Sequence, residues 1–208
     1  MIKQRKVTLE GRFIILRKPE YKESGVLYKW YNDPEFRNLY AVDLISTKEQ
    51  IKNTVEYYQK VNFYTAHNLL FMIINRKSGE PLGVAFLDHI SSNHKHARFG
   101  IGIAEKAFRK KCFGFDAAVV LLDFAFYDLQ LHRVWTEVYE HNQQSITACL
   151  KFGLRNEGIM RDHIQVNSYF CNLVLFSILE DKYRSLPLVN KWRVRIPQKN
   201  CYKKGENL

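Results

Sequence analysis

The stretch "AFRKKCFGFDAAVVLLDFAF", residues 107–126, changes from a basic turn to an apolar helix within a few positions. Three basic residues come first (109–111), a single glycine follows at Gly114, and apolar residues dominate from Phe115 onward. A glycine-containing turn before a helix directs several backbone N–H groups at one point, and the helix dipole adds positive potential there. By itself the stretch fits either a phosphate-binding turn or a solvated basic turn before a core helix.

Hydrophobic patterning on both sides of this stretch predicts alternating strands and helices. The expected strands cover residues 8–17, 68–76, 81–90, 97–103, 133–139, 155–166 and 168–181. The expected helices cover residues 20–31, 46–61, 115–129 and 142–153. We therefore expect one domain of the α+β (mixed α/β) class. A central, mixed but mostly antiparallel sheet of about seven strands should carry helices on both faces.

Local signals mark several of these boundaries. Pro34 disfavours a helical residue before it and should end the first helix. Ser46 and Glu49 have the spacing of a capping box at the start of the second helix. Asn142 and Gly153 are typical of a helix N-cap and a C-terminal stop.

Composition limits the class of protein. A chain of 208 residues with 46 % hydrophobic content is long enough for one packed core. The charged N-terminus has no apolar segment behind it, so we expect no signal peptide, and no apolar run is long enough for a membrane span. The four cysteines (112, 149, 171 and 201) have no CxxC spacing. We expect reduced thiols and a cytoplasmic protein.

The net charge of +11 is concentrated at the C-terminal end. The last 27 residues hold eight Lys or Arg and a single acid. We therefore predict a domain over residues 1–181 and a basic extension over residues 182–208. The extension is interpreted as solvated or loosely docked, with contact to an acidic partner as the alternative. Nucleic acid is an unlikely partner because the extension lacks regularly interleaved aromatic residues.

Three segments together resemble the GNAT superfamily of N-acetyltransferases. "RKKCFG" (109–114) is similar to the acetyl-CoA motif Gln/Arg-x-x-Gly-x-Gly/Ala, and "NQQSITACLKFGLRNEG" (142–158) is similar to the motif that follows it. "WYNDPEF" (30–36) resembles the branch containing the ribosomal-protein N-terminal acetyltransferases, which also includes enzymes for sugar nucleotides, polyamines and drugs. The resemblance covers about residues 8–181. Cys112 replaces the first motif glycine, and its side chain would strain the turn if its φ were positive.

The resemblance implies acetyl-CoA as co-substrate. Backbone N–H groups from Lys110 to Phe115 would hold the pyrophosphate. The strand end near Gly102 would pair with the pantetheine arm, with Gly100 and Gly102 leaving room for it. Asn142 would either bind the arm besides capping its helix, or cap the helix alone. The residues assigned to the cofactor are Ile101, Gly102, Ile103, Arg109, Lys110, Lys111, Cys112, Phe113, Gly114, Phe115 and Asn142. His94 and His96 have no ligand partners nearby, so we expect no metal.

Acetyl transfer to an amine needs a base for the ammonium and an acid for the leaving thiolate. Glu137 has the spacing of the general base in the resembled family, and a solvent-facing strand residue is the alternative. Asp88 and His89 are reserve bases. For the acid, Ser145 is preferred over Cys149, because a cysteine on a short helix is more often a small core residue. Tyr139 is a further candidate.

The acceptor is expected to enter across the first helices. Trp30, Asp33, Glu35 and Tyr40 are predicted to bind it, because carboxylates attract an ammonium, and surface charge is the alternative. The sequence predicts an N-acetyltransferase for a primary amine: a protein N-terminus, an aminosugar nucleotide, a polyamine or a drug. The alternatives are an inactive acyl-CoA-binding module, suggested by Cys112 and Cys149, and a basic ribosome- or RNA-associated protein. The expected state is a monomer or homodimer.

Overall fold

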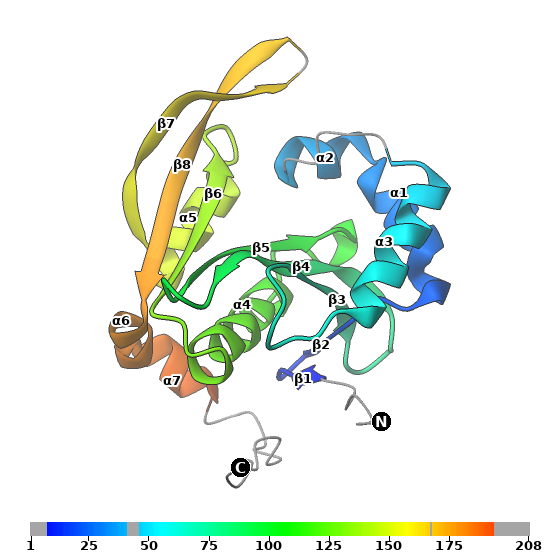
Figure 1. Ribbon diagram of the computed structural model, residues 1–208. Coiled ribbons are helices and arrows are strands. Elements are labelled where there is room, and N and C mark those ends of the chain that lie inside the picture. The colour runs from blue at the N-terminus through cyan, green and yellow to red at the C-terminus, as the bar shows by residue number, and fades with distance from the viewer. Residues whose placement is uncertain (1–7, 41–45, 167, 194–208) are drawn as a thin grey trace, which may run out of the picture.

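A single eight-stranded sheet forms the centre of the computed structural model, which describes residues 8–40, 46–166 and 168–193 (Figure 1). The strand order is β1-β2-β3-β4-β5-β6-β8-β7, and only β5 and β6 pair in parallel. The strands are β1 (Leu9–Glu10), β2 (Ile14–Arg17), β3 (Leu69–Asn75), β4 (Pro81–Ser91), β5 (His96–Ile103), β6 (Arg133–Tyr139), β7 (Arg155–Val166) and β8 (Tyr169–Leu179). The predicted α+β class with a mostly antiparallel sheet is confirmed.

The strand count differs from the prediction at the N-terminus. The expected strand over residues 8–17 is two short strands, β1 and β2, which pair with each other. The Gly11 N–H donates to the Ile14 carbonyl at 2.8 Å, and this tight turn breaks the strand. Asp116 holds the turn by accepting hydrogen bonds from the backbone N–H groups of residues 12–14.

Helices cover both faces of the sheet. The helices are α1 (Ser24–Tyr31), α2 (Pro34–Tyr40), α3 (Lys48–Lys60), α4 (Phe113–Asp123), α5 (Gln143–Phe152), α6 (Glu180–Ser185) and α7 (Pro187–Arg193). A π-helical turn, Phe124–Asp128, extends α4. The predicted capping box of α3 lies one residue later than expected, because Thr47 and Gln50 form it.

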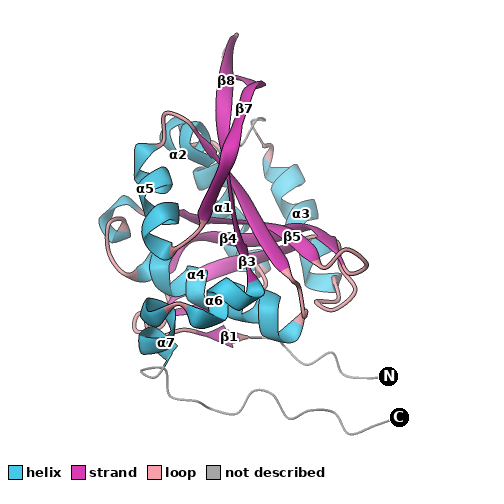
Figure 2. Ribbon diagram, turned by 90° about the vertical axis from the view of Figure 1, so that its left-hand side faces the viewer, coloured by secondary structure: helices cyan, strands magenta, loops and turns pink. Residues whose placement is uncertain are grey.

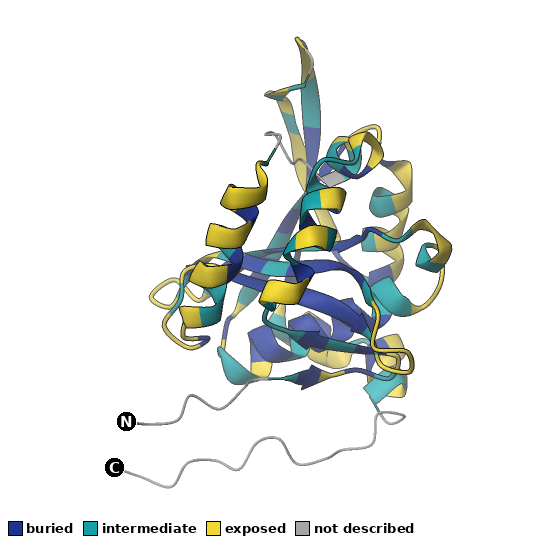
Figure 3. Ribbon diagram, turned by 90° about the vertical axis from the view of Figure 1, so that its right-hand side faces the viewer, coloured by how far each residue is buried: buried dark blue, intermediate teal, exposed yellow. Residues whose placement is uncertain are grey.

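The two helical layers enclose two hydrophobic cores. Alternate residues of β3 point to opposite faces, so Met72 packs with α1 and α3 while Phe71 packs with α4. This explains why β3 reads as a nearly continuous apolar run rather than an alternating one. In Figure 3 the central strands are buried, and exposed residues lie on the outer faces of the helices.

β5 and β6 separate soon after they begin. Their pairing is limited to residues His96–Arg98 of β5, which lie opposite Arg133–Trp135 of β6. Beyond that point β6 continues along β8, while β5 stays with β4. Among the described residues, no strand pairs with the β6-facing edge of residues 99–103. The sheet therefore opens between these two strands, between the α1–α3 layer and the α4–α5 layer.

Two glycines near this opening allow close packing. The Gly102 carbonyl oxygen lies 1.9 Å from the position of a Cβ on Gly83, so only glycine fits there. A Cβ on Gly100 would lie 2.2 Å from the Phe86 ring. The prediction that Gly100 leaves room for a cofactor arm is therefore wrong, because Phe86 fills that room.

β7 and β8 form a long hairpin that projects beyond the rest of the sheet (Figure 1, Figure 2). β7 is the edge strand of the sheet, and its register shifts twice, between Asn156 and Gly158 and between Met160 and Ile164. Such bulges hinder the pairing of an edge strand with another chain.

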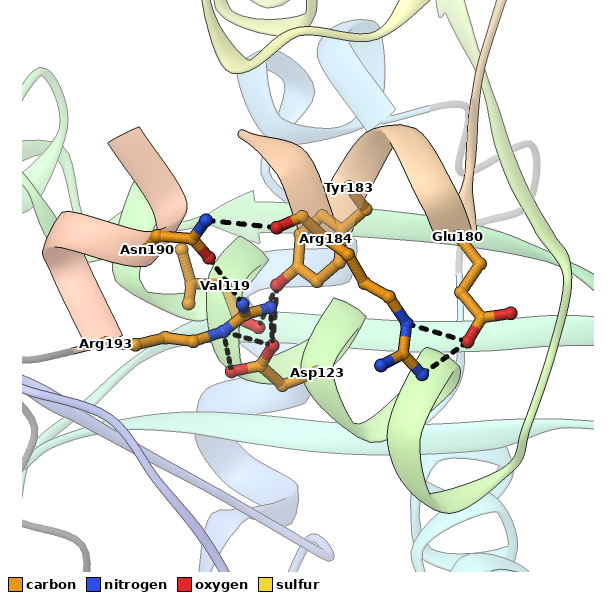
Figure 4. A network of polar contacts seen from close by, with 7 residues as sticks. All are labelled: Val119, Asp123, Glu180, Tyr183, Arg184, Asn190 and Arg193. Atoms are coloured by element: carbon orange, nitrogen blue, oxygen red, sulfur yellow. Dashed lines mark hydrogen bonds and ion pairs between the residues drawn. The ribbon is translucent and has the colours of Figure 1, made fainter. Parts of the chain in front are cut away.

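The C-terminal helices are part of the packed fold. Tyr183 of α6 and Val189 of α7 are fully buried. Figure 4 shows Tyr183 and Arg193 converging on Asp123, with 2.9 Å between the Tyr183 hydroxyl and Asp123 Oδ1. The boundary predicted at residue 181 thus falls inside α6. The interpretation of a solvated extension is wrong for residues 182–193, and residues 194–208 lie outside the described part.

Candidate active site

The basic turn leads directly into α4 beside the opening of the sheet. The first helical hydrogen bond runs from the Asp116 N–H to the Cys112 carbonyl at 2.9 Å. The N–H groups of residues 113–115 precede that bond and have no acceptor within the helix. Cys112 has an ordinary φ of −68°, so the expected strain at this position is absent. The left-handed residue is Lys110, with φ of 57°.

Arg109 points inward from the turn. Its Nε donates to the Ile103 carbonyl at 2.9 Å, and its Nη2 donates to the Ala104 carbonyl at 3.1 Å. Its Nη1 pairs with Glu35, which also pairs with Lys106. Hydrogen bonds from Lys106 first, and then from Arg109, lower the pKa of Glu35. Arg109 therefore fastens the turn to β5 and α2, and it shares the carboxylate of Glu35 with Lys106.

The other predicted cofactor residues fall into two groups. Lys110, Lys111 and Cys112 are exposed. Phe113 and Phe115 pack their rings against other aromatic residues. Gly114, in the first turn of α4, is half-buried.

The strand end assigned to the pantetheine arm has its carbonyls only partly free. The Ile103 carbonyl is taken by Arg109, and the Ile103 side chain belongs to the core beside α4. Ile101 also packs against that core, and its neighbour Gly102 is buried opposite Val84 of β4. The remaining edge of residues 99–102 has the backbone groups that an extended ligand can pair with.

Asn142 is buried and uses both ends of its amide. Its Oδ1 accepts from the Ser145 N–H at 3.1 Å, which caps α5. Its Nδ2 donates to the Leu39 carbonyl at 3.3 Å, near the end of α2. The neighbouring His141 contacts the Asn38 carbonyl through Nε2 at 3.2 Å. These bonds tie α2 to the start of α5 across the opening of the sheet.

Glu137 lies on β6 just past the point where β5 leaves it. Its Oε2 accepts from Arg98 Nη1 at 2.9 Å, and the same guanidinium makes two bonds to Asp88, at 2.7 and 2.8 Å. Burial acts to raise the pKa of Asp88, but the hydrogen bonds from Arg98 and His89 outweigh it, so the net shift is downward. The hydrogen bond to Asp88 raises the pKa of Arg98. One cation thus orients two carboxylates at the opening.

The candidate acids differ in environment. Burial raises the pKa of the Cys149 thiol to about 12, which makes it a poor proton donor near neutral pH. Ser145 lies in the first turn of α5 and is half-buried. Tyr139 is buried on β6, with its ring stacked on His141 at 5.1 Å. The structure places Ser145 and Glu137 on the two elements that border the β6 side of the opening.

The predicted acceptor residues are used differently from one another. Trp30 is buried, and its indole N–H donates to Glu105 at 2.8 Å. Asp33 accepts from the Phe36 N–H at 2.8 Å and so holds the start of α2. Glu35 is paired with two cations, so its expected role of attracting an ammonium is not supported. The side chain of Tyr40 lies outside the described part.

A cavity of about 260 Å³ lies between α1, α2 and the end of β5. It is lined by Lys29, Trp30, Asp33, Phe36, Ala104, Glu105, Lys106 and Ala107. Its charged side chains are two lysines and two acids. The cavity has no net preference for one sign of charge.

Sequence reasoning missed Arg98. Its guanidinium lies over the rings of Phe86 (5.6 Å) and Trp135 (6.0 Å), between the two carboxylates. The available signal was an arginine within the otherwise apolar strand "ARFGIGI". An arginine inside a strand that pairs on both sides needs acidic partners on neighbouring strands.

Comparison with known proteins identifies the family of this chain. The sequence profile described as an acetyltransferase (GNAT) domain matches residues 14–155, more than half of the chain. The chain belongs to the GNAT family of acetyltransferases. It is 24 % identical over 176 residues to the uncharacterized N-acetyltransferase p20 of Bacillus licheniformis, covering 85 % of this chain and 98 % of that protein. It is 27 % identical over 105 residues to spermidine N(1)-acetyltransferase of Escherichia coli K12, and this match covers 50 % of this chain and 56 % of that protein.

A solved structure supports the GNAT fold. Spermidine N-acetyltransferase from Vibrio cholerae, in complex with CoA and spermine, superposes with a TM-score of 0.74 at 19 % identity. The match covers 82 % of this chain and 98 % of that one. The predicted family and the predicted N-acetyltransferase class are therefore confirmed.

No group of three or more His, Cys, Asp or Glu side chains in the described ranges is arranged to hold a metal ion. Within the same ranges, no helix has the length and apolar character that crossing a membrane requires.

Proposed function

We propose that this GNAT domain moves an acetyl group from acetyl-CoA to a primary amine by direct attack on the thioester, with Glu137 as general base. The observation that carries the proposal is the position of Glu137. It lies where β5 and β6 part, held by Arg98 and only 17 % exposed. A carboxylate fixed at the opening of the sheet can accept a proton from an amine that enters beside it.

The cofactor side of the opening fits CoA. N–H groups at the start of α4 are free to bind a pyrophosphate, and Lys110 and Lys111 add positive charge beside them. The open edge at residues 99–102 suits an extended amide-containing arm such as pantetheine. When bound, acetyl-CoA supplies the activated acyl group. The chain's own residues orient it and exclude water.

The acceptor side favours a cationic amine with an aliphatic stem. Phe86 and Trp135 flank Arg98 with apolar ring surface, while Asp88 and Glu137 supply two negative charges against one positive charge. Tyr58 lies near Asp88. Burial raises the pKa of Tyr58, and the charges of Tyr57 and then Asp88 raise it further. Rings with carboxylates recognise ammonium groups well. A polyamine, as in the spermidine N-acetyltransferase relatives, is therefore the first acceptor proposed.

Acetyl-CoA binding and turnover test this proposal directly. Acetyl-CoA at about 100 times its dissociation constant should stabilise the fold by roughly 2.7 kcal/mol, which raises Tm by several degrees. Thiol release should then be fastest with spermidine or spermine in a panel that includes N-terminal peptides, an aminosugar nucleotide and an aminoglycoside. No Tm shift at millimolar acetyl-CoA would reject the cofactor. A Tm shift without thiol release from any amine would favour the inactive acyl-CoA-binding module.

The acid is tested by a pair of substitutions in α5. Ser145→Ala should lower kcat by about 10-fold, a modest effect because a thiolate of ordinary pKa near 8.5 needs little assistance to leave. Cys149→Ala should leave kcat nearly unchanged, since a buried thiol with a pKa of about 12 cannot supply the proton. The rates of both variants should be measured at saturating acetyl-CoA. A crippled Cys149→Ala beside an active Ser145→Ala would reverse the assignment.

A further inference from the structure

Three charged side chains form a row across the opening of the sheet: Asp88 of β4, Arg98 of β5 and Glu137 of β6. Asp88 lies opposite Arg98 in the register of β4 and β5, and Arg98 lies opposite Trp135 where the pairing of β5 with β6 ends. Glu137 is two residues beyond Trp135, and residues two apart on a strand share a face. The row therefore lies on one face of the sheet, at the point where β5 and β6 separate.

Arg98 divides its guanidinium unequally between the two carboxylates. Its Nε and Nη2 donate to both oxygens of Asp88, at 2.8 and 2.7 Å, whereas Nη1 makes one bond of 2.9 Å to Glu137 Oε2. His89 Nδ1 also lies 3.1 Å from Asp88 Oδ1, but its ring is largely exposed to water. Among the described residues, no hydrogen bond or ion pair uses Glu137 Oε1. Glu137 is thus held by one oxygen, and the other oxygen is left for a ligand.

We propose that Asp88 and Arg98 form a positioning pair for Glu137, in which Arg98 aims the base and Asp88 balances the charge of Arg98 once Glu137 is protonated. The inference rests on the proposed role of Glu137 as general base. Both residues of the pair act on the reaction through Glu137. Arg98 also leaves the row with one net negative charge, which matches a single ammonium group beside the base.

The balance of charge explains why a carboxylate bonded to a guanidinium can still take up a proton. When the acceptor enters as an ammonium ion, two carboxylates face two cations. When an N–H bond of the ammonium breaks and its proton moves to Glu137 Oε1, the amine and Glu137 both become neutral. Arg98 then remains paired with Asp88. Without Asp88 the same transfer would leave a half-buried guanidinium without a counter-charge, which costs free energy.

Arg98→Met removes the guanidinium and keeps an unbranched side chain. It should lower kcat by about 10- to 100-fold, because a misplacement of about 1 Å costs up to that factor. The KM for the acceptor should stay the same or fall, since two unneutralised carboxylates attract an ammonium more strongly than one. A purely structural loss would raise KM instead. Arg98→Lys restores the charge and should recover most of the lost kcat.

A double-mutant cycle tests whether Asp88 acts through Arg98. Asp88→Asn alone should lower kcat several-fold. In the Arg98→Met background the same substitution should cause no further loss, because the charge that Asp88 balances is already absent. Independent losses that add in the double variant would overturn the assigned pair, since residues that do not interact show additive effects.

Arg133→Met is the matched control. Arg133 lies on β6 and is an ion-paired arginine of similar exposure to Arg98, 31 % against 28 %, but its carboxylate partner is Glu157 rather than Glu137. This variant should leave kcat and the acceptor KM nearly unchanged. The Tm of each variant reports its folding.

The outcomes separate the positioning pair from the base itself. Full kcat in Arg98→Met beside a slow Glu137→Gln would overturn the inference and leave the proposed base standing. Full kcat in Asp88→Asn would also overturn it, whatever the stability of the Arg98 variants. Full kcat in Glu137→Gln would reject the base and the inference together.

Discussion

Glu137→Gln should lower kcat by about 10²–10⁴-fold, the usual contribution of a positioned base. The amide keeps the size of the side chain and can still bond Arg98, but it cannot accept the proton of an incoming ammonium. The measurement is kcat with the best acceptor from the panel.

Asp88→Asn is the matched control for this substitution. It removes one negative charge from the same guanidinium, whose other partner is Glu137, and the two carboxylates are similarly buried. We expect a loss of less than about 10-fold, because Asp88 lies on β4 rather than on the strand that borders the opening. If Asp88→Asn is the crippled variant and Glu137→Gln keeps its rate, the base is Asp88. If both keep their rates, His89 becomes the first candidate.

Much of the fold was predictable because its signals are local. β3 to β6 and the hairpin of β7 and β8 appear near the expected positions, since apolar runs bounded by turn residues specify strands. The break between β1 and β2 was not predictable, because it depends on Asp116, about 100 residues further along the chain. The packing of α6 was missed for a similar reason. Its charged surface suggested solvation, while its one buried ring, Tyr183, contacts α4.

The site was predictable at the level of segments but not of side chains. The basic turn was placed correctly at the start of a helix and beside the open edge of β5. The partner of each charge could not be predicted from the sequence, because Arg109 and Glu35, which form an ion pair, are 74 residues apart. Arg98 was missed because its role exists only once three neighbouring strands are aligned in register.

Asp116→Ala should reduce the free energy of unfolding by roughly 3–5 kcal/mol, as expected when a buried charge-assisted network loses its only acceptor. The carboxylate is fully buried and accepts four hydrogen bonds, from the N–H groups of Arg12 (3.1 Å), Phe13 (2.6 Å) and Ile14 (3.1 Å) and from the Trp192 indole (2.7 Å). Alanine would leave all four donors without an acceptor. Urea-induced unfolding, followed by circular dichroism, measures the loss.

Two further variants separate the hydrogen bonds of Asp116 from its volume and its charge. Asp116→Asn keeps the volume but turns an amide N–H₂ toward backbone donors, so it should still cost about 2 kcal/mol or more. Asp181→Ala removes a carboxylate from the exposed first turn of α6 and should cost less than about 1 kcal/mol. A stability close to wild type for both Asp116 variants would contradict the assigned role. Because the same carboxylate aligns α4 with Trp192, a destabilised Asp116→Asn should also bind CoA more weakly, which links the stability of this turn to the cofactor proposal.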